Sequence, residues 1–437
     1  MRAVAFMTLG CKVNQFETET MEGLFRAHGY TVVPFETAAD VYVINTCSVT
    51  HLSDRKSRQL IRRAQRMNPR ACIAVCGCYA QVAPEEIRAL SGVRVVLGTK
   101  ERAHIVAYVE EALKEGAGLI EQVTDVMQAR SFEDIPMTSM PHRTRAFLKI
   151  EDGCQNFCSF CIIPYARGPV KSRQLSAVQR EIERFVAAGF HEVVLTGIHL
   201  GAYGIDLPAR PTLADACRTA LSLPELRRLR LGSLESVELS ADLLSLMRTE
   251  PRFAAHLHLP LQAGSDAVLR AMNRHYDTAA FAHLLSEVRS AVPGVAISTD
   301  IIVGFPGETE EQFDEGLRFV RAMGFSRLHV FPYSPRKGTP AAARTDQVPG
   351  ALRRERAARM QALAGALSEQ FHHASLGRVA PVLFEREAGG VFDGLTDTYI
   401  RVYTDAPVSR GEMVPMHLMR LYRDGVWGVP HSTIKNP

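Results

Sequence analysis

Short apolar runs alternate with amphipathic helical patterns in two successive series, and this alternation constrains the fold more than any other feature. In the first series, strands are predicted at residues 4–7, 41–44, 72–75 and 93–97, and helices at 17–28, 53–67 and 84–90. Strands that alternate with helices form parallel sheets covered on both faces. Residues 1–120 are therefore expected to form a doubly wound α/β domain.

The second series has six predicted strands, at residues 146–150, 192–196, 228–231, 255–259, 295–303 and 326–331. Helical patterns separate them, notably at 176–188, 279–292 and 310–323. Six βα units make up three quarters of an eight-fold barrel. Residues 146–345 are therefore expected to form a partial (βα)6, TIM-like barrel, joined to the first domain by a proline-containing linker at 121–145.

The C-terminal region has a different pattern. An amphipathic, arginine-rich stretch predicts a connecting helix over residues 346–371. Short alternating runs at 379–384, 390–395, 399–403 and 411–418, with glycines between them, predict a small all-β barrel over 372–437.

Composition excludes several classes of protein. The 437 residues carry a formal charge of +4, 46% hydrophobic and 22% charged residues, which is typical of globular chains and permits nucleic acid as a partner. No apolar run approaches the roughly 20 residues of a membrane helix, so no membrane association is expected. Gly10-Cys11 superficially resembles a lipoprotein signal, but the apolar stretch before it is too short and is better explained as a strand. Nine unevenly clustered cysteines favour the reducing cytoplasm over a disulfide framework.

The strongest chemical signal is the triplet Cys154, Cys158 and Cys161, spaced C-x3-C-x2-C after the first barrel strand. Structural zinc sites and ferredoxin-type clusters need four ligands, and Cys217 is the next cysteine along the chain. Three thiolates on one loop fit a [4Fe-4S] cluster with one open iron, which can chelate a substrate. Zinc and a chance cluster of cysteines are the alternatives.

A second group of cysteines is spread more widely. Cys11, Cys47 and Cys78 each follow a predicted strand, and the carboxyl ends of parallel strands meet at one sheet edge. Cys72 and Cys76 compete for a role there, but their register predicts burial, where a free cysteine acts as a small hydrophobe. The pattern leads to the hypothesis of a second three-cysteine metal cluster.

The triplet at 154–161 matches in full the motif of the radical S-adenosylmethionine superfamily, whose partial barrel is the one expected here. This resemblance implies that the open iron holds the amino and carboxylate groups of S-adenosylmethionine and that reduction yields a 5′-deoxyadenosyl radical. Phe160 matches the aromatic position near the adenine; a buried core residue is the alternative.

Further motifs resemble those of the methylthiotransferases within that superfamily. They are TLGCKVNQ at 8–15, INTCSVT at 44–50, GCYAQ at 77–81, EDGC at 151–154, CIIPYARG at 161–168, HLPLQAGS at 258–265, TDIIVGFPGE at 299–308 and YSPRKGT at 333–339. The resemblance implies that Cys11, Cys47 and Cys78 bind a second [4Fe-4S] cluster, which carries the sulfur to be delivered. The tail resembles the RNA-binding TRAM barrel of the same family.

Within the family, CKVN at 11–14 is most similar to the MtaB group. Relatives that modify isopentenyladenosine usually have Gln-Met-Asn after the cysteine that corresponds to Cys11, and those that modify ribosomal protein S12 have Pro-Lys-Asn. The resemblance implies methylthiolation of N6-threonylcarbamoyladenosine at tRNA position 37, with two S-adenosylmethionine molecules as methyl donor and radical source. The expected partners are the tRNA anticodon arm and an electron donor such as flavodoxin or ferredoxin. The alternatives are isopentenyladenosine tRNA, a ribosomal protein side chain, and a non-catalytic iron–sulfur RNA-binding sensor.

Other candidate residues follow the barrel strands or carry charge. Gly197, Ser233, Glu235 and Gly304 end strands on the face where barrel enzymes place chemistry, so they are candidate S-adenosylmethionine contacts, with turn geometry or a solvated loop as the alternative. Arg55, Arg58 and Arg62 belong to a basic run in which a solvated helix face competes with phosphate binding. In the tail, Arg401 and Tyr403 are candidate RNA contacts, with packing inside the barrel as the alternative.

Overall fold

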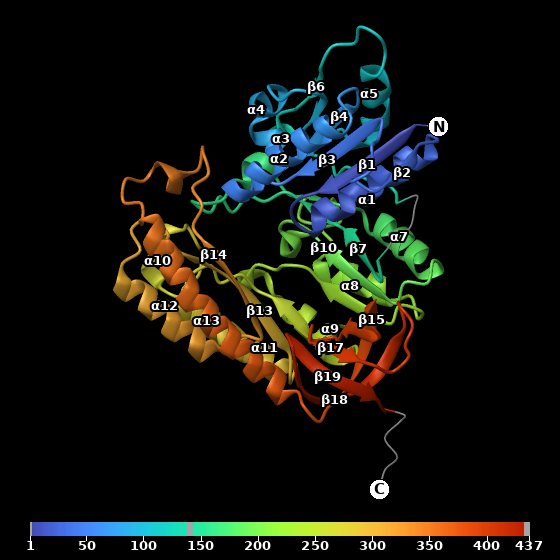
Figure 1. Cartoon of the computed structure of the whole chain (residues 1–437). Coiled ribbons are helices and arrows are strands. Elements are labelled where there is room, and N and C mark those ends of the chain that lie inside the picture. Colours follow the sequence, from blue (N-terminus) through green and yellow to red (C-terminus); the bar gives the residue numbers. More distant parts are fainter. Residues whose placement is uncertain (1, 138–142, 432–437) are drawn as a thin grey trace.

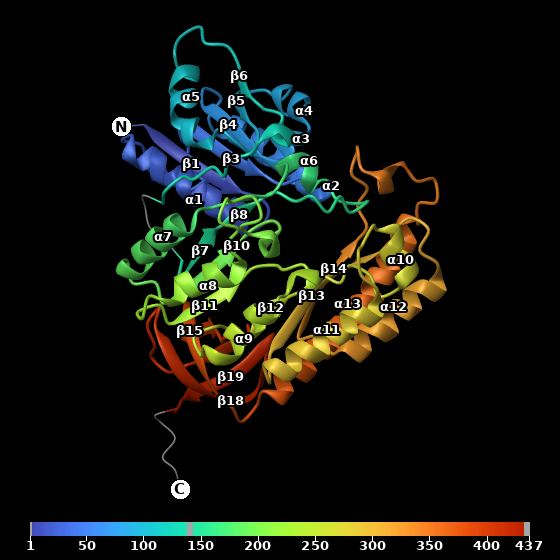
Figure 2. The same ribbon diagram turned by 180° about the vertical axis from the view of Figure 1, so that it is seen from behind.

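The computed structural model describes residues 2–137 and 143–431 of the chain. Figures 1 and 2 show an N-terminal α/β unit at one end, a curved α/β barrel in the middle and a small β-barrel at the other end. This architecture confirms the expected fold class. The domain boundaries at 120, 145 and 345 remain predictions, and the part of the expected linker at 138–142 lies outside the described residues.

The N-terminal sheet has six parallel strands in the order β2-β1-β3-β4-β5-β6. Their bounds are β1 (Ala3–Thr8), β2 (Thr31–Val33), β3 (Val41–Thr46), β4 (Cys72–Gly77), β5 (Val93–Leu97) and β6 (Ile120–Gln122). Apolar side chains of α1 (Lys12–Ala27) and α5 (Ile105–Ala112) pack on one face. Those of α2 (His51–Met67), α3 (Cys78–Val82) and α4 (Pro84–Arg88) pack on the other. The sheet is therefore doubly wound, as predicted.

The central barrel contains the six predicted strands: β7 (Arg145–Lys149), β10 (Glu192–Thr196), β11 (Arg228–Leu231), β12 (His256–His258), β13 (Ala296–Val303) and β14 (Arg327–Pro332). They form two three-stranded parallel sheets, joined by isolated bridges between Leu229 and Phe253 and between Ser233 and His258. The outer helices are α7 (Leu175–Ala187), α8 (Leu213–Leu221), α9 (Ala241–Thr249), α10 (Asp266–Ala271), α11 (Thr278–Ala291) and α12 (Glu310–Met323). Because β7 and β14 do not pair with each other, the barrel is open on one side.

The predicted connecting helix is α13 (Gly350–Ala374), which packs its apolar face against the barrel core. It leads into a closed five-stranded barrel in the order β15-β16-β17-β19-β18. The strands are β15 (Val379–Ala388), β16 (Val391–Leu395), β17 (Arg401–Thr404), β18 (Met413–Tyr422) and β19 (Gly425–Pro430). This small barrel, which is consistent with a TRAM domain, lies beside the amino ends of the central strands (Figure 1).

A buried group of charges joins the N-terminal unit to the central barrel. The carboxylate of Glu17 on α1 lies 2.5 Å from Arg102, 2.5 Å from Arg167 and 2.8 Å from Lys149. Burial alone would raise the pKa of Glu17, but the three cations lower it to about 2. Glu17 is therefore ionised, and its ion pairs hold α1 against β7 and against the segment that follows Cys154, Cys158 and Cys161.

Among the described residues, no helix combines the length and the apolar character needed to cross a membrane.

Candidate functional site

The N-terminal cysteines Cys11, Cys47 and Cys78 lie where three neighbouring strands end. Cys11 precedes α1 after β1, Cys47 directly follows β3, and Cys78 is the first residue of α3 after β4. A Cβ atom built on Gly10 would lie only 3.1 Å from the Cβ of Cys47, so these two loops are in contact. The structure thus brings the three thiols together at the carboxyl edge of the sheet, as predicted from parallel strands.

Two polar side chains and one glycine fix these loops. The amide of Asn14 donates hydrogen bonds to the carbonyls of Leu9 (2.8 Å) and Thr46 (3.0 Å), which ties the Cys11 loop to the Cys47 loop. Gly77 has φ of +96°, and a Cβ there would lie 2.4 Å from Oδ1 of Asn45. Only glycine fits this turn, which places Cys78 at the sheet edge.

Cys72, Cys76 and Cys217 are fully buried in apolar cores, as expected. The sulfur of Cys76 lies 4.0 Å from the sulfur of Met21, between the sheet and α1. Burial raises the pKa of Cys72 to about 11 and that of Cys76 to about 12. Cys72 and Cys76 belong to the apolar core on one face of the N-terminal sheet, and Cys217 belongs to the core of the central barrel.

The triplet of Cys154, Cys158 and Cys161 lies on the loop between β8 (Glu151–Asp152) and α6 (Ile163–Arg167). This loop is anchored at both ends: the N–H of Cys154 donates to the carbonyl of Gly168 (3.0 Å), and that of Ser159 donates to the carbonyl of Met272 (3.0 Å). The carboxyl ends of the barrel strands surround the loop, which is the face where barrel enzymes place chemistry.

Sequence reasoning missed two residues that contact this triplet. Arg274 donates to the sulfur of Cys158 (3.2 Å) and is itself paired with Glu235. Burial lowers the pKa of His199, but hydrogen bonds with Cys154 and Glu238 raise it to about 10 overall. His199 follows β10, a position that could have marked it, whereas nothing in the sequence around Arg274 indicates its contact.

The donor sets fit iron–sulfur clusters better than single ions. Of the His, Cys, Asp and Glu side chains described, only His258, Asp300 and His329 bring three ligand atoms within 4.8 Å of one another. In neither cysteine triplet do all three sulfur atoms lie within 4.8 Å of one another, and thiolates are the ligands that iron–sulfur clusters use. Burial raises the pKa of Cys78 and of Cys161 to about 12, so these thiols are neutral until a metal displaces their protons.

One cavity has walls from both regions. It has a volume of about 190 Å³. Phe160 and Cys161, from the loop of the Cys154 triplet, line it together with Val49 and Thr50, which follow Cys47. The N–H of His51 donates to the hydroxyl of Ser334 (3.1 Å), which closes the N-terminal unit onto the loop after β14. Cys161 and the residues that follow Cys47 therefore line one space between the N-terminal unit and the central barrel.

The candidate S-adenosylmethionine contacts lie in varied surroundings. Phe160 lines the shared cavity and also packs on an apolar cluster of the barrel. Ser233 follows β11 and is half-buried, while the carboxylate of Glu235 is bound by Arg274. A Cβ on Gly197 would lie 2.6 Å from Oε2 of Glu151, and one on Gly304 would lie 2.3 Å from Cγ of Arg353 on α13. Close packing within the protein accounts for both glycines.

The candidate RNA contacts also differ among themselves. Arg55 and Arg62 are exposed on α2, whereas Arg58 is bonded to Tyr79 and Glu86. Arg401 pairs with Asp393 and Asp424. Tyr403 is 8% exposed and its hydroxyl donates to Asp424, which favours packing within the barrel over base stacking.

A more open aromatic surface lies next to Tyr403. The guanidinium of Arg420 lies 5.3 Å from the ring centroids of both Tyr422 and Trp427, and that of Arg423 lies 5.1 Å from Tyr422. Both arginines are exposed, and both rings are half-buried. Trp427, which lies on the unpredicted strand β19, was missed from the sequence.

Comparisons with known proteins identify the family. Residues 3–98 match the uncharacterized protein family UPF0004, and residues 148–320 match the Radical SAM superfamily. Threonylcarbamoyladenosine tRNA methylthiotransferase MtaB of Bacillus subtilis is 43% identical over 407 residues, which cover 92% of this chain and 90% of that protein. The chain belongs to the radical SAM tRNA methylthiotransferase family. This confirms the resemblance inferred from the motifs and makes the protein a transferase.

Other relatives of this methylthiotransferase agree. MtaB of Aquifex aeolicus is 36% identical, with 94% of this chain and 98% of that protein covered. A tRNA-2-methylthio-N(6)-dimethylallyladenosine synthase of Rickettsia conorii is 34% identical, with 92% of each chain covered. The radical S-adenosylmethionine methyltransferase TsrM from Kitasatospora setae superposes with a TM-score of 0.56 at 15% identity, over 78% of this chain and 75% of that one, and shows the shared fold. Family membership implies S-adenosylmethionine and two [4Fe-4S] clusters as cofactors.

Proposed function

We propose that this enzyme converts N6-threonylcarbamoyladenosine at tRNA position 37 to its 2-methylthio derivative. The observation that carries the proposal is the cavity lined by Cys161 and, from the N-terminal unit, by Val49 and Thr50 just after Cys47, because sulfur transfer and hydrogen removal must occur at the same adenine C2. Relatives named for this substrate share 43% and 36% identity with the chain, against 34% for one named for dimethylallyladenosine. The identities of 36% and above favour the threonylcarbamoyl substrate, while one further relative named for it shares 32%.

The cysteines divide the chemistry between the two domains. We assign Cys154, Cys158 and Cys161 to the cluster that binds S-adenosylmethionine, and Cys11, Cys47 and Cys78 to the second cluster. When bound, these groups supply a radical able to break an unactivated C–H bond and the sulfur that replaces the hydrogen. A radical route has a physical reason, since the adenine C2–H is too weakly acidic for a general base.

The protein's own residues position and shield the reaction. Arg274 donates to Cys158 and is held by Glu235, so it keeps a positive charge beside a ligand thiolate. Phe160, Ile162 and Ile163 give the shared cavity an apolar wall that excludes water. Val49, 53% exposed, and Phe331, 42% exposed, line the same cavity and offer open apolar surface to an incoming base.

Two surfaces are suited to the anticodon arm. Arg55 and Arg62 expose positive charge on the helix that follows the Cys47 loop, and such charges bind phosphates. Arg420 and Arg423 interleave with Tyr422 and Trp427 on the small barrel, an arrangement that stacks bases. We infer that the C-terminal barrel acts as an RNA-binding TRAM domain and that the enzyme works in the cytoplasm, where tRNA and a one-electron donor such as flavodoxin or ferredoxin are present.

The substrate is tested by competition under anaerobic conditions. Reconstituted enzyme, reductant and S-adenosylmethionine are incubated with equal amounts of threonylcarbamoylated and isopentenylated tRNA, and methylthio nucleosides are measured by mass spectrometry. We expect product from the threonylcarbamoylated tRNA alone. Product from isopentenylated tRNA alone would show that isopentenyladenosine is the substrate.

A non-catalytic RNA-binding sensor is tested separately. We expect wild-type enzyme to form 5′-deoxyadenosine from S-adenosylmethionine, and Cys158→Ala to abolish this while still binding tRNA. The matched control is Cys217→Ala, which removes a fully buried thiol outside both triplets. Absence of 5′-deoxyadenosine from the wild type would support the sensor.

A further inference from the structure

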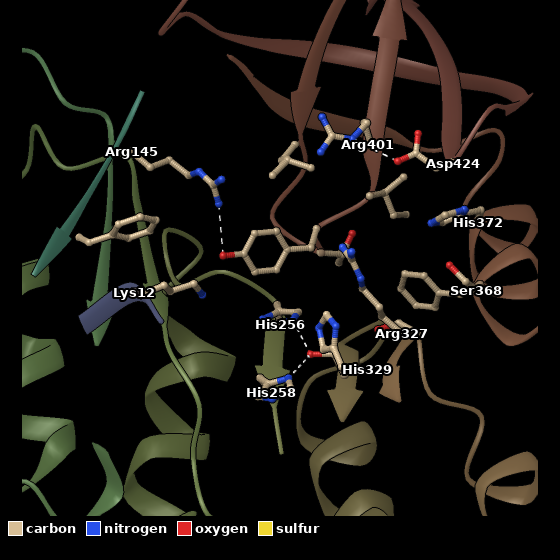
Figure 3. A pocket seen from close by; sticks show the side chains of 18 residues that line it. Lys12, Arg145, His256, His258, Arg327, His329, Ser368, His372, Arg401 and Asp424 are labelled. Carbon is tan, nitrogen blue, oxygen red and sulfur yellow. Dashed lines mark hydrogen bonds and ion pairs between the residues drawn. The ribbon is translucent and has the colours of Figure 1, made fainter. Parts of the chain in front are cut away.

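A second cavity, of about 470 Å³, lies between the central barrel and the small β-barrel (Figure 3). Its walls come from both edge strands of the open barrel, through Arg145 on β7 and Arg327 on β14, and from the segment containing Tyr399. Lys12 enters it from the start of α1, next to Cys11. One wall of the cavity is therefore formed by the residue next to Cys11.

The two cavities adjoin through one side-chain pair. Asp300 lines the cavity beside Cys161, and His258 lines the second cavity, with Nε2 of His258 lying 3.3 Å from Oδ2 of Asp300. The His258–Asp300 pair therefore forms part of the wall between the two cavities, which a substituent on a base in the first cavity would have to pass to reach the second.

Positive charge dominates the second cavity. Arg145 is neutralised by Glu385 at 2.8 Å, and Arg401 is paired with Asp393. In residues 2–137 and 143–431, by contrast, no carboxylate lies within ion-pair distance of Lys12 or Arg327. The ammonium of Lys12 instead lies 5.7 Å from the ring centroid of Tyr399.

This excess positive charge lowers the pKa of two groups around the cavity. Burial together with Arg230, His258, Lys12 and Arg327 holds the pKa of His256 well below its usual value. Burial would raise the pKa of Tyr399, but Arg230, Lys12 and Arg145 lower it overall. An anion in this cavity would therefore be stabilised.

An unsatisfied polar atom also lies in the cavity wall. His256 is 5% exposed; its Nε2 shares a hydrogen bond of 3.1 Å with the hydroxyl of Ser298. Its buried Nδ1 has no partner in the described part of the chain, which is costly unless a ligand supplies one. Figure 3 shows His256, His258 and His329 grouped on one side of the cavity, with Lys12 opposite Arg327 across it.

We propose that this cavity binds the N6 substituent of the substrate and that Lys12 contacts its carboxylate. This inference rests on the proposed function: threonine joined through its amine to the N6 carbonyl group keeps a free carboxylate and a hydroxyl, whereas an isopentenyl group has neither. Arg327 adds a second charge at the far edge, and Nδ1 of His256 is available to a polar atom of the substituent. Lys12 is thus a specificity-determining residue placed one position after a proposed cluster ligand.

A backbone phosphate of the anticodon loop shares the anionic chemistry, so the test separates the two sources. Three synthetic anticodon stem-loops differ only at position 37, which is threonylcarbamoyladenosine, its threonine carboxamide, or unmodified adenosine. Affinity is measured by fluorescence anisotropy with reconstituted enzyme and without reductant, so that no turnover occurs.

We expect wild-type enzyme to bind the carboxylate stem-loop about tenfold more tightly than the carboxamide, as a charge-assisted contact predicts. Lys12→Met should remove this preference, and Lys114→Met, which changes an exposed lysine after α5, should retain it. Arg327→Gln should reduce the preference without altering a neighbour of Cys11. Iron content is measured for each variant, and Arg327→Gln decides the test if Lys12→Met loses iron.

Two results would overturn the proposal. An equal loss of affinity for all three stem-loops in Lys12→Met would identify a phosphate contact, and an unchanged preference in both variants would exclude the cavity. The proposed function is tested by a different measurement: it would be contradicted if wild-type enzyme formed no methylthio product from threonylcarbamoylated tRNA.

Discussion

Cys76 and Cys78 are separated by a single residue, yet the structure gives them opposite surroundings. Cys76 lies in the apolar core between the sheet and α1, whereas Cys78 begins α3 at the sheet edge beside Cys11 and Cys47. The sequence favoured Cys78 because an apolar register continues through Cys76. The placement of the side chains supports the same choice.

These surroundings predict different effects on iron binding. Cys78→Ala should lose the N-terminal cluster and with it roughly half of the bound iron, since each cluster holds four irons. Cys76→Ala should keep full iron content and lose only packing energy, on the order of 1 kcal/mol. Iron and sulfide analysis of anaerobically reconstituted variants measures the difference. Equal iron loss in both variants would show that the assignment of Cys78 is wrong.

The features of the site that could not be predicted are contacts between residues far apart in the sequence. The triplet at Cys154 was recognisable because its spacing is local. The contact of Arg274 with Cys158 depends on how α10 and the loop after it fold back on the cluster loop, which no local pattern encodes. Gly197 and Gly304 were predicted from their positions after strands, but they are crowded by Glu151 and Arg353, which only the tertiary structure reveals.

At the level of elements, the turn from β4 to α3 determines where Cys78 lies. Gly77→Ala would force a left-handed alanine and place its Cβ 2.4 Å from Asn45 and 2.5 Å from the carbonyl of Thr46. We expect this variant to lose about 3 kcal/mol of unfolding free energy and to bind iron poorly at the N-terminal group.

A matched control separates backbone strain from crowding. Gly116 also has a positive φ, of +75°, but no described atom lies within 4 Å of the position that a Cβ would take there. Gly116→Ala should therefore cost only about 1 kcal/mol and leave iron content unchanged. Urea unfolding and iron analysis check both variants, and equal effects would argue against the role of the Gly77 turn.

Element prediction succeeded where patterns were long and failed for short edge strands. All six central strands were predicted within one residue at each end, because each is a short segment with buried apolar residues between helical patterns. β2 and β6 have three residues each and lie at the two edges of their sheet, so they carry almost no pattern. β19 was missed because Gly425 and Gly428 interrupt its alternation, and these glycines are needed where Arg401 and Val402 approach closely.

For the whole molecule, the buried charges around Glu17 join the N-terminal unit to the central barrel. Because the pKa of Glu17 falls from 4.5 to about 2 on folding, its ionised form stabilises the folded state above pH 4.5. That stabilisation should be lost as the pH decreases from about 4.5 towards 2.

Glu17→Gln should remove this contribution at neutral pH. Leaving Arg102, Arg167 and Lys149 without their shared carboxylate should cost about 3–5 kcal/mol of unfolding free energy and flatten the acid dependence below pH 4.5. Glu110→Gln, at an exposed position of α5, is the control. Urea midpoints measured from pH 7 to pH 3 provide the test, and parallel pH profiles for wild type and Glu17→Gln would contradict it.

Binding of tRNA should depend on charges that the protein does not pair internally. Arg55 and Arg62 are exposed, whereas Arg63 pairs with Glu36 at 3.6 Å. Replacing Arg55 or Arg62 by Gln should weaken tRNA binding and reduce the slope of log K against log salt by about 1 for each phosphate that is no longer bound. Arg63→Gln should have a smaller effect. Unchanged slopes in all three variants would remove α2 from the RNA interface.

We expect the two cysteine groups to act together on one modified adenosine. The most direct test is nucleoside mass spectrometry of threonylcarbamoylated tRNA after anaerobic incubation with reconstituted enzyme, reductant and S-adenosylmethionine. We expect a 2-methylthio product with wild-type enzyme and none with Cys47→Ala, although this variant should still form 5′-deoxyadenosine through the intact triplet at Cys154. Full methylthiolation by Cys47→Ala would show that sulfur transfer does not need the N-terminal cysteines, and that the two cysteine groups do not act together.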